Sequence, residues 1–131
     1  MKHLKYSDVA LVPQYSEVHS RSDCDVSVEF LEQKFKLPII PANMKSVINI
    51  DMAKWMSENR YFYIMHRFGH DLTEDIGNAQ EWKFISFSLG VKTKDKIAIQ
   101  QISKRDYRVD CLTIDIAHGD HTLMEKAIEF V

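Results

Sequence analysis

Four short apolar runs recur along the chain, and a segment with helical spacing follows each of them. The runs are nearly continuous and rich in Ile, Phe, Val or Tyr, and they cover Leu37–Met44, Tyr61–Arg67, Phe84–Gly90 and Cys111–Ala117. Continuous apolar runs of this length are typical of strands that are covered on both faces, as in parallel sheets. The pattern therefore predicts four buried parallel strands.

The intervening segments place apolar residues three or four positions apart, as helices do. The predicted helices cover residues 48–56, 71–82, 94–104 and 123–131. Expected N-caps are Asp71 for the second helix, Thr93 for the third, and Asp120 or Thr122 for the fourth. In the third helix, Ile97 and Ile102 should point inward.

Regular spacing of the run ends predicts repeated βα units with right-handed crossovers. Two architectures contain four such units: a small doubly wound sheet, and part of a (β/α)8 barrel. The chain spends 36 residues before the first run and has no glycine-rich phosphate loop after it, which favours the barrel. It also ends on the apolar residues of its last predicted helix, which is expected of a truncated chain.

The sequence therefore predicts an α/β chain that forms the first half of a (β/α)8 TIM barrel. Residues 1–36 would form an N-terminal arm and a β-hairpin, with the turn near Glu32-Gln33. Residues 37–131 would form the four βα units of the incomplete barrel.

Composition narrows the function classes. The formal net charge is −2 and no basic block stands out, so nucleic acid is not an expected partner. No apolar run approaches the ~20 residues of a membrane span, and no apolar stretch follows the N-terminus as in a signal peptide. Cys24 and Cys111 lack metal-like spacing, so a cytoplasmic protein with reduced thiols is the interpretation.

Several separated motifs resemble one known family. The segments LPIIPANMKSV, YIMHRF and CLTIDIAHGDH, and the opening YSDVALVPQYSEVHSRSD, resemble the GMP reductases, which are relatives of IMP dehydrogenase. PANMKSV and MHRF favour the bacterial GMP reductases over the IMP dehydrogenases. The resemblance implies a (β/α)8 barrel, assembled as a homotetramer, that uses NADPH to convert GMP to IMP and ammonia.

The same resemblance assigns binding residues at the carboxyl ends of the predicted strands, which is where (β/α)8 barrels carry their active sites. Substrate GMP or IMP would contact Ala42, Asn43 and Met44. The cofactor would contact Arg67, Asp115 and Ala117, and, from the arm of a neighbouring subunit, Ser20 and Arg21. From the residues alone, Met44 is ordinary core, Arg67 is equally a solvated charge, and Ser20 and Arg21 belong to an exposed loop.

The stretch TIDIAHGDH allows a second interpretation, because Asp115, His118, Asp120 and His121 are potential zinc or iron ligands. Their spacing matches no strong metal signature, and His118 to His121 cross a turn into a helix. We therefore interpret Asp115 as a strand-end carboxylate beside the cofactor and expect no metal. Gly119 fits a tight turn there.

The resemblance also implies what the 131 residues lack. The family's nucleophilic cysteine belongs to a glycine-rich Cys-Thr-Thr loop, expected beyond residue 131 together with a monovalent cation (K+). Neither Cys24 nor Cys111 stands in that context. We therefore assign no catalytic residue and expect the chain alone to be inactive. The alternatives are an IMP dehydrogenase fragment, and a non-catalytic half-barrel that serves binding or assembly.

Overall fold

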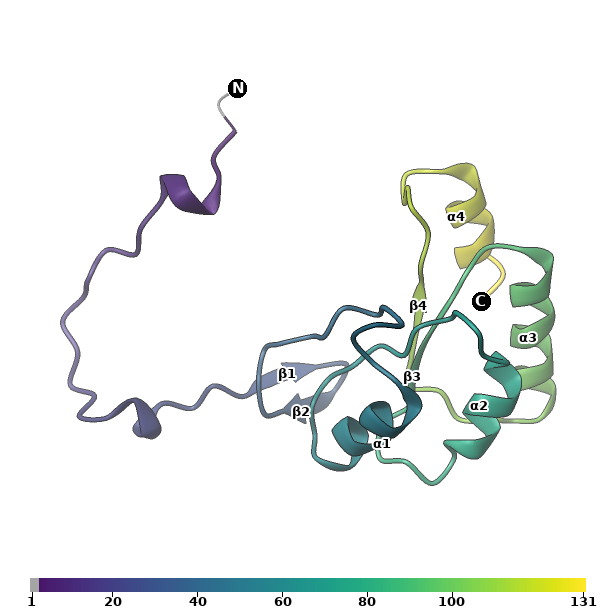
Figure 1. Cartoon of the computed structure of the whole chain (residues 1–131), viewed down its shortest axis with the longest axis horizontal. Coiled ribbons are helices and arrows are strands. Elements are labelled where there is room, and N and C mark those ends of the chain that lie inside the picture. Colours follow the sequence, from purple (N-terminus) through teal and green to yellow (C-terminus); the bar gives the residue numbers. More distant parts are fainter. Residues whose placement is uncertain (1–2) are drawn as a thin grey trace.

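The N-terminal arm stands apart from the rest of the protein. The structure, a computed structural model, describes residues 3–131. Residues 3–26 are exposed and largely extended, with two short 3-10 turns, η1 (Tyr6–Asp8) and η2 (Arg21–Asp23). Figure 1 shows this arm running away from the folded body. Nothing in the described part of the chain covers its apolar side chains.

A β-hairpin follows the arm, as the sequence predicts. Strands β1 (Val28–Phe30) and β2 (Gln33–Phe35) pair antiparallel, with Val28 opposite Phe35. The turn lies at Leu31 and Glu32, one residue earlier than expected, and their φ angles are 50° and 58°. Left-handed values at both central residues match the twist of the two strands, although they strain residues that carry a Cβ.

The central sheet is parallel, and its middle strand is buried. Strand β3 (Ser86–Leu89) is buried along its whole length and pairs with β4 (Cys111–Ile114), Ser86 facing Cys111 and Leu89 facing Ile114. One residue of the second apolar run joins this sheet through a parallel bridge, because Met65 pairs with Phe87. The fold is therefore α/β, with one parallel and one antiparallel sheet.

The strand predicted at Leu37–Met44 is wrong, because this segment is extended but pairs with no other strand among residues 3–131. Pro38 and Pro41 remove two N–H donors from it, which weakens any ladder. For the second run, the predicted strand reduces to the single bridge at Met65.

Four α-helices follow the extended segments in the predicted order. They are α1 (Ile50–Glu58), α2 (Leu72–Asn78), α3 (Thr93–Lys104) and α4 (Thr122–Ile128). Figure 1 shows α2 and α3 side by side beyond β3, and α4 next to the end of β4. No helix among the described residues is long and apolar enough to cross a membrane.

The helix caps agree with the sequence only in part. The predicted cap of α2 is confirmed, because Asp71 Oδ1 accepts hydrogen bonds from the backbone of Thr73 and Glu74. Thr93 does not cap α3 but is its first residue, and the side chain that ties down this end is Asp95. Neither Asp120 nor Thr122 caps α4, since His121 Nδ1 accepts from Leu123 N at 3.0 Å. Imidazole nitrogen replaces the usual carboxylate or hydroxyl oxygen there.

Aromatic rings fill the core between the hairpin and the sheet. Phe84 packs against Phe35, Phe62 and Tyr63, with ring centroids 5.2 to 6.1 Å apart. The Tyr63 hydroxyl also donates to the carbonyl oxygen of Phe84 at 2.7 Å. Such aromatic pairs add to the stabilisation that burial alone provides.

Two predicted inward residues of α3 differ. Ile102 is buried, as expected, but the expectation for Ile97 is wrong, because 48% of its surface is exposed. The face of α3 that carries Ile102 packs toward α2 and the sheet, and Ile97 lies outside that face.

The substitution Phe84→Ala should lower the free energy of unfolding by roughly 3–5 kcal/mol, because it empties a fully buried aromatic site. Urea unfolding followed by circular dichroism measures this change. Phe30→Ala is the matched control, since Phe30 is half exposed and should cost much less. Equal losses in the two variants would contradict the assignment of Phe84 to the core.

Candidate functional site

The carboxyl ends of the parallel segments meet at one edge of the sheet and bring two predicted residues together. Asp115 follows β4, and its backbone N–H donates to the carbonyl oxygen of Leu89 at 2.8 Å. Arg67 follows the Met65 bridge, and its Nε lies 3.2 Å from Asp115 Oδ2. The two residues are 48 positions apart in the chain, so only the parallel pairing explains their contact.

The loop between β3 and α3 completes this arrangement. Asp95 is buried and accepts hydrogen bonds from the backbone N–H groups of Gly90 and Lys92 at 3.1 and 2.9 Å. Gly90 lies between this carboxylate and the Arg67 guanidinium. We refer to Arg67, Gly90, Asp95 and Asp115 as the strand-end cluster.

The chemistry of the strand-end cluster suits a phosphorylated ligand. The side chains of Arg67 and Asp115 are 27% and 32% exposed, so both can still be reached from solvent. A guanidinium offers a planar set of N–H donors to phosphate oxygens, and a carboxylate accepts hydrogen bonds from hydroxyl or amide groups. An ion pair this exposed contributes little to stability, about 0–1 kcal/mol.

The predicted substrate residues form no hydrogen bond or ion pair with the strand-end cluster in the described chain. Ala42, Asn43 and Met44 end the unpaired segment, and more than half of the Met44 surface is exposed. The interpretation of Met44 as ordinary core is therefore wrong for the described chain. Ala117 is also exposed, two residues beyond Asp115.

Ser20 and Arg21 lie in the arm, which runs away from the folded body (Figure 1). The Ser20 hydroxyl accepts a hydrogen bond from Ser22 N, and Asp23 Oδ2 accepts one from Ser20 N, which together build the turn η2. Their contact with the cofactor of a neighbouring subunit stays a prediction.

A pair of histidines behind Arg67 was assigned no binding or catalytic role from the sequence. His66 is buried, and its Nδ1 accepts a hydrogen bond from Phe68 N at 3.2 Å. The His70 ring lies 4.7 Å from that of His66, and His70 Nδ1 is 2.9 Å from Asp75 Oδ2 of α2. Burial, and then the positive charges of His70 and Lys45, lower the pKa of His66. His66 is therefore neutral, and its Nδ1 acceptor stabilises the turn from His66 to Phe68, which contains Arg67.

The His and Asp side chains of TIDIAHGDH do not converge. Residues 117–121 are exposed, and His121 is occupied in capping α4. In residues 3–131 no three side chains of His, Cys, Asp or Glu gather as metal ligands would. Cys24 is exposed in the arm, and Cys111 begins β4, at the end opposite Asp115.

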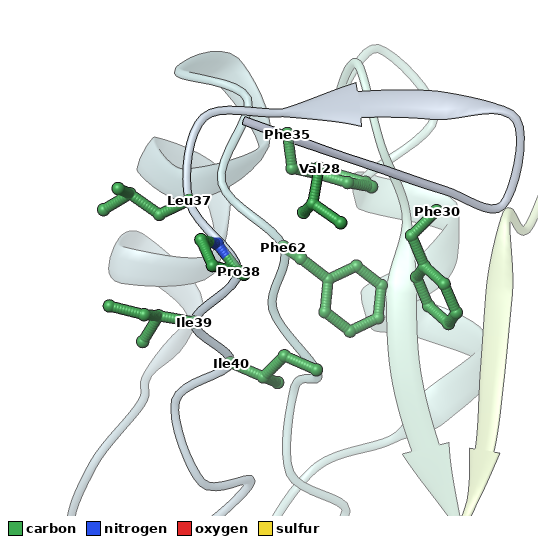
Figure 2. A pocket seen from close by; sticks show the side chains of 8 residues that line it. All are labelled: Val28, Phe30, Phe35, Leu37, Pro38, Ile39, Ile40 and Phe62. Atoms are coloured by element: carbon green, nitrogen blue, oxygen red, sulfur yellow. The ribbon is translucent and has the colours of Figure 1, made fainter. Parts of the chain in front are cut away.

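Two apolar cavities adjoin the unpaired segment and share Leu37 and Ile39 in their linings. The first, of about 210 Å³, lies between the hairpin and residues 37–40, with Ile40 turned toward Phe62 (Figure 2). The second, of about 300 Å³, is lined by Leu37, Ile39, Pro41, Met52, Trp55, Met56 and Tyr61. Neither offers a charged group that could orient a nucleotide, so the strand-end cluster is the better binding site.

Comparison with known proteins decides the family. The sequence model described as the IMP dehydrogenase / GMP reductase domain matches residues 3–131. The chain belongs to the IMP dehydrogenase / GMP reductase family.

Individual members of the IMP dehydrogenase / GMP reductase family match along nearly the whole chain. GMP reductase of Staphylococcus carnosus is 44% identical over 91% of the chain, and that of Helicobacter pylori is 44% identical over 98%. GMP reductase of Leptothrix cholodnii is 40% identical over 100%. The chain spans 37% to 41% of the length of these three relatives.

A solved structure of the family has the same fold. Inosine 5′-monophosphate dehydrogenase from Legionella pneumophila superposes with a TM-score of 0.73 at 26% identity. The superposition covers 94% of this chain and 38% of that one. Both sequence and fold therefore align the chain with about two fifths of larger family members.

Acidification should destabilise the fold through His66. The pKa of His66 is lower in the folded state than its ordinary 6.5, so the unfolded chain binds the proton first as pH falls. The free energy of unfolding should therefore decrease below about pH 6.5. Urea titrations across this range measure the decrease.

His66→Asn is the matched control, because Asn Oδ1 replaces Nδ1 as the acceptor for Phe68 N but does not titrate. The pH dependence should become shallower in this variant. An unchanged slope would show that His66 does not carry the effect.

Proposed function

We propose that this chain provides the first four βα units of a GMP reductase, a (β/α)8 barrel that converts GMP to IMP and ammonia with NADPH. The single observation that carries the proposal is its 38% to 44% identity to GMP reductases over 91% to 100% of its length. The likeness to a solved IMP dehydrogenase supports the barrel.

The strand-end cluster fits the cofactor end of such a site. Arg67 would bind a phosphate of NADPH, and Asp115 would accept a hydrogen bond from a ribose hydroxyl or the carboxamide. Ala117 would lie beside the cofactor, and Ser20 and Arg21 would approach it from a neighbouring subunit. When bound, NADPH supplies the hydride of the reaction.

The substrate would lie at the end of the unpaired segment. Ala42, Asn43 and Met44 would pack along the purine nucleotide, and the exposed Met44 has the flexible side chain that such packing needs. Complete enzymes of this type would be cytoplasmic homotetramers in purine nucleotide interconversion.

The proposed reaction needs a nucleophile that these residues do not place at the site. Covalent attack on the purine requires a cysteine near the strand ends, and Cys24 and Cys111 lie elsewhere. The nucleophilic cysteine and a K+ ion would be supplied by a further part of the barrel. The chain by itself should therefore bind but not turn over.

The first alternative is IMP dehydrogenase, favoured by the solved structure from Legionella pneumophila. IMP-dependent reduction of NAD by the complete gene product would support it over GMP reductase. The family match by itself covers both enzymes.

The second alternative is a non-catalytic assembly module, favoured by the apolar cavities. Ile39, Ile40 and Trp55 are each more than half exposed beside them. Apolar surface of this kind marks contacts with other protein. A folded, strictly monomeric chain in sedimentation experiments would contradict this alternative.

The purified 15.3 kDa chain should show no GMP-dependent oxidation of NADPH, because the nucleophile is not supplied. Absorbance of NADPH after addition of GMP measures the reaction, and mass spectrometry of the same sample verifies the chain. The same assay with Cys111→Ser is the control. Turnover that disappears in this variant would assign the nucleophile to Cys111 and overturn the proposed division of the barrel.

A further inference from the structure

Two contacts set the orientation of the Arg67 side chain, and a glycine borders it. Its Nε lies 3.2 Å from Asp115 Oδ2, and its guanidinium carbon lies 4.5 Å from the centre of the Phe68 ring. Gly90 borders the guanidinium without a side chain of its own, since a Cβ atom built there would lie 3.5 Å from Arg67 Nη1, an ordinary van der Waals distance. The β3–α3 loop therefore leaves room for the guanidinium that Phe68 and Asp115 contact.

Gly90 is needed for space rather than for its backbone angles, since its φ is not left-handed. The same Cβ atom would also lie 3.0 Å from Asp95 Oδ2. Carbon and oxygen at this distance are closer than van der Waals contact allows, so one neighbour would have to move. Any side chain at position 90 therefore presses on Asp95, and it comes into van der Waals contact with the Arg67 guanidinium.

Asp95 cannot move without breaking its own contacts. It is 8% exposed, and its two carboxylate oxygens accept from Gly90 N and Lys92 N at 3.1 and 2.9 Å. These bonds join the loop after β3 to the first turn of α3. A buried carboxylate that loses such hydrogen bonds raises the free energy of the folded state, so Asp95 is held in place beside Gly90.

We propose that Gly90 and Asp95 are positioning residues. Asp95 fixes the loop through Gly90 N and Lys92 N, and Gly90 leaves the space in which the Arg67 guanidinium keeps Nε toward Asp115 and its remaining N–H groups available to an anionic ligand. The identity of that ligand rests on the proposed function, in which Arg67 binds a phosphate of NADPH. We assign it to the phosphate that NADH lacks. Gly90 and Asp95 would then control the preference for the phosphorylated cofactor without touching it.

The first test asks whether Gly90 positions Arg67, with no ligand present. In the 131-residue chain labelled with 15N, the Arg67 Nε–H resonance should be shifted and protected from exchange by Asp115. Gly90→Ala should move this resonance and speed its exchange. Gly119→Ala is the matched control, because a Cβ atom at Gly119 meets nothing within 4 Å. An unchanged Arg67 resonance in Gly90→Ala would overturn the positioning role.

The second test asks whether this position affects the cofactor. Fluorescence titrations of the chain should give an NADPH affinity that falls roughly tenfold in Gly90→Ala, the worth of one charge-assisted hydrogen bond. NADH affinity should not change, and Gly119→Ala should bind both like the original chain. Equal losses for NADPH and NADH would overturn the assignment of the phosphate to Arg67.

A second variant tests the proposal in case Gly90→Ala does not fold. Asp95→Asn keeps the size of the side chain but removes its charge and turns one acceptor into a donor, which should loosen the same loop. Its NADPH affinity should fall in the same direction, provided that circular dichroism shows the helices intact. A folded Asp95→Asn chain with the original Arg67 resonance and cofactor preference would remove Asp95 from the proposal.

If the original chain binds neither NADPH nor NADH, the cofactor part of the proposed function fails for this chain. The Arg67 resonance still decides the positioning role in that case, because it is measured without ligand. The two proposals can therefore fail separately.

Discussion

Parallel pairing around β3 is the interaction on which the rest of the structure depends. One register aligns Leu89 with Ile114 and so places Gly90 beside Asp115. The Met65 bridge on the other side of β3 sets the position of Arg67. A shift of either neighbour by one residue would reverse its faces and separate the ion pair. The strand-end cluster is therefore a consequence of register, and its residues come from the segments that follow three different strand positions, Asp95 from the first turn of α3.

The aromatic core supports this register from the opposite end. Phe84 precedes β3 and packs against Phe35 of the hairpin and Phe62 of the second apolar run. Rings of this size, in edge-to-face or tilted contact, resist sliding because each fills a closely packed space. The hairpin thus covers the amino end of the sheet, and the side chains of Arg67 and Asp115 at the carboxyl end stay partly exposed.

The hairpin, the order of the four helices and two of the four predicted parallel strands followed from the sequence, and the structure of the first two apolar runs did not. Continuous apolar runs predicted β3 and β4, and Asp71 predicted the start of α2. The same pattern in Leu37–Met44 does not form a strand, because hydrophobicity reports burial while pairing also needs backbone donors that Pro38 and Pro41 lack. The caps Asp95 and His121 were missed, although an Asp two residues inside a helix start is a readable signal.

By itself the sequence determined the α/β class, the hairpin, the family resemblance and two members of the strand-end cluster, Arg67 and Asp115. These follow from local composition and motifs, which do not depend on how the chain folds. Only the tertiary structure decided that Arg67 and Asp115 form an ion pair and that Gly90 leaves space beside Arg67. It also decided that Asp95 and His66 are buried. Such contacts join residues up to 48 positions apart. They depend on strand register and on close packing, and neither can be derived from a pattern along the chain.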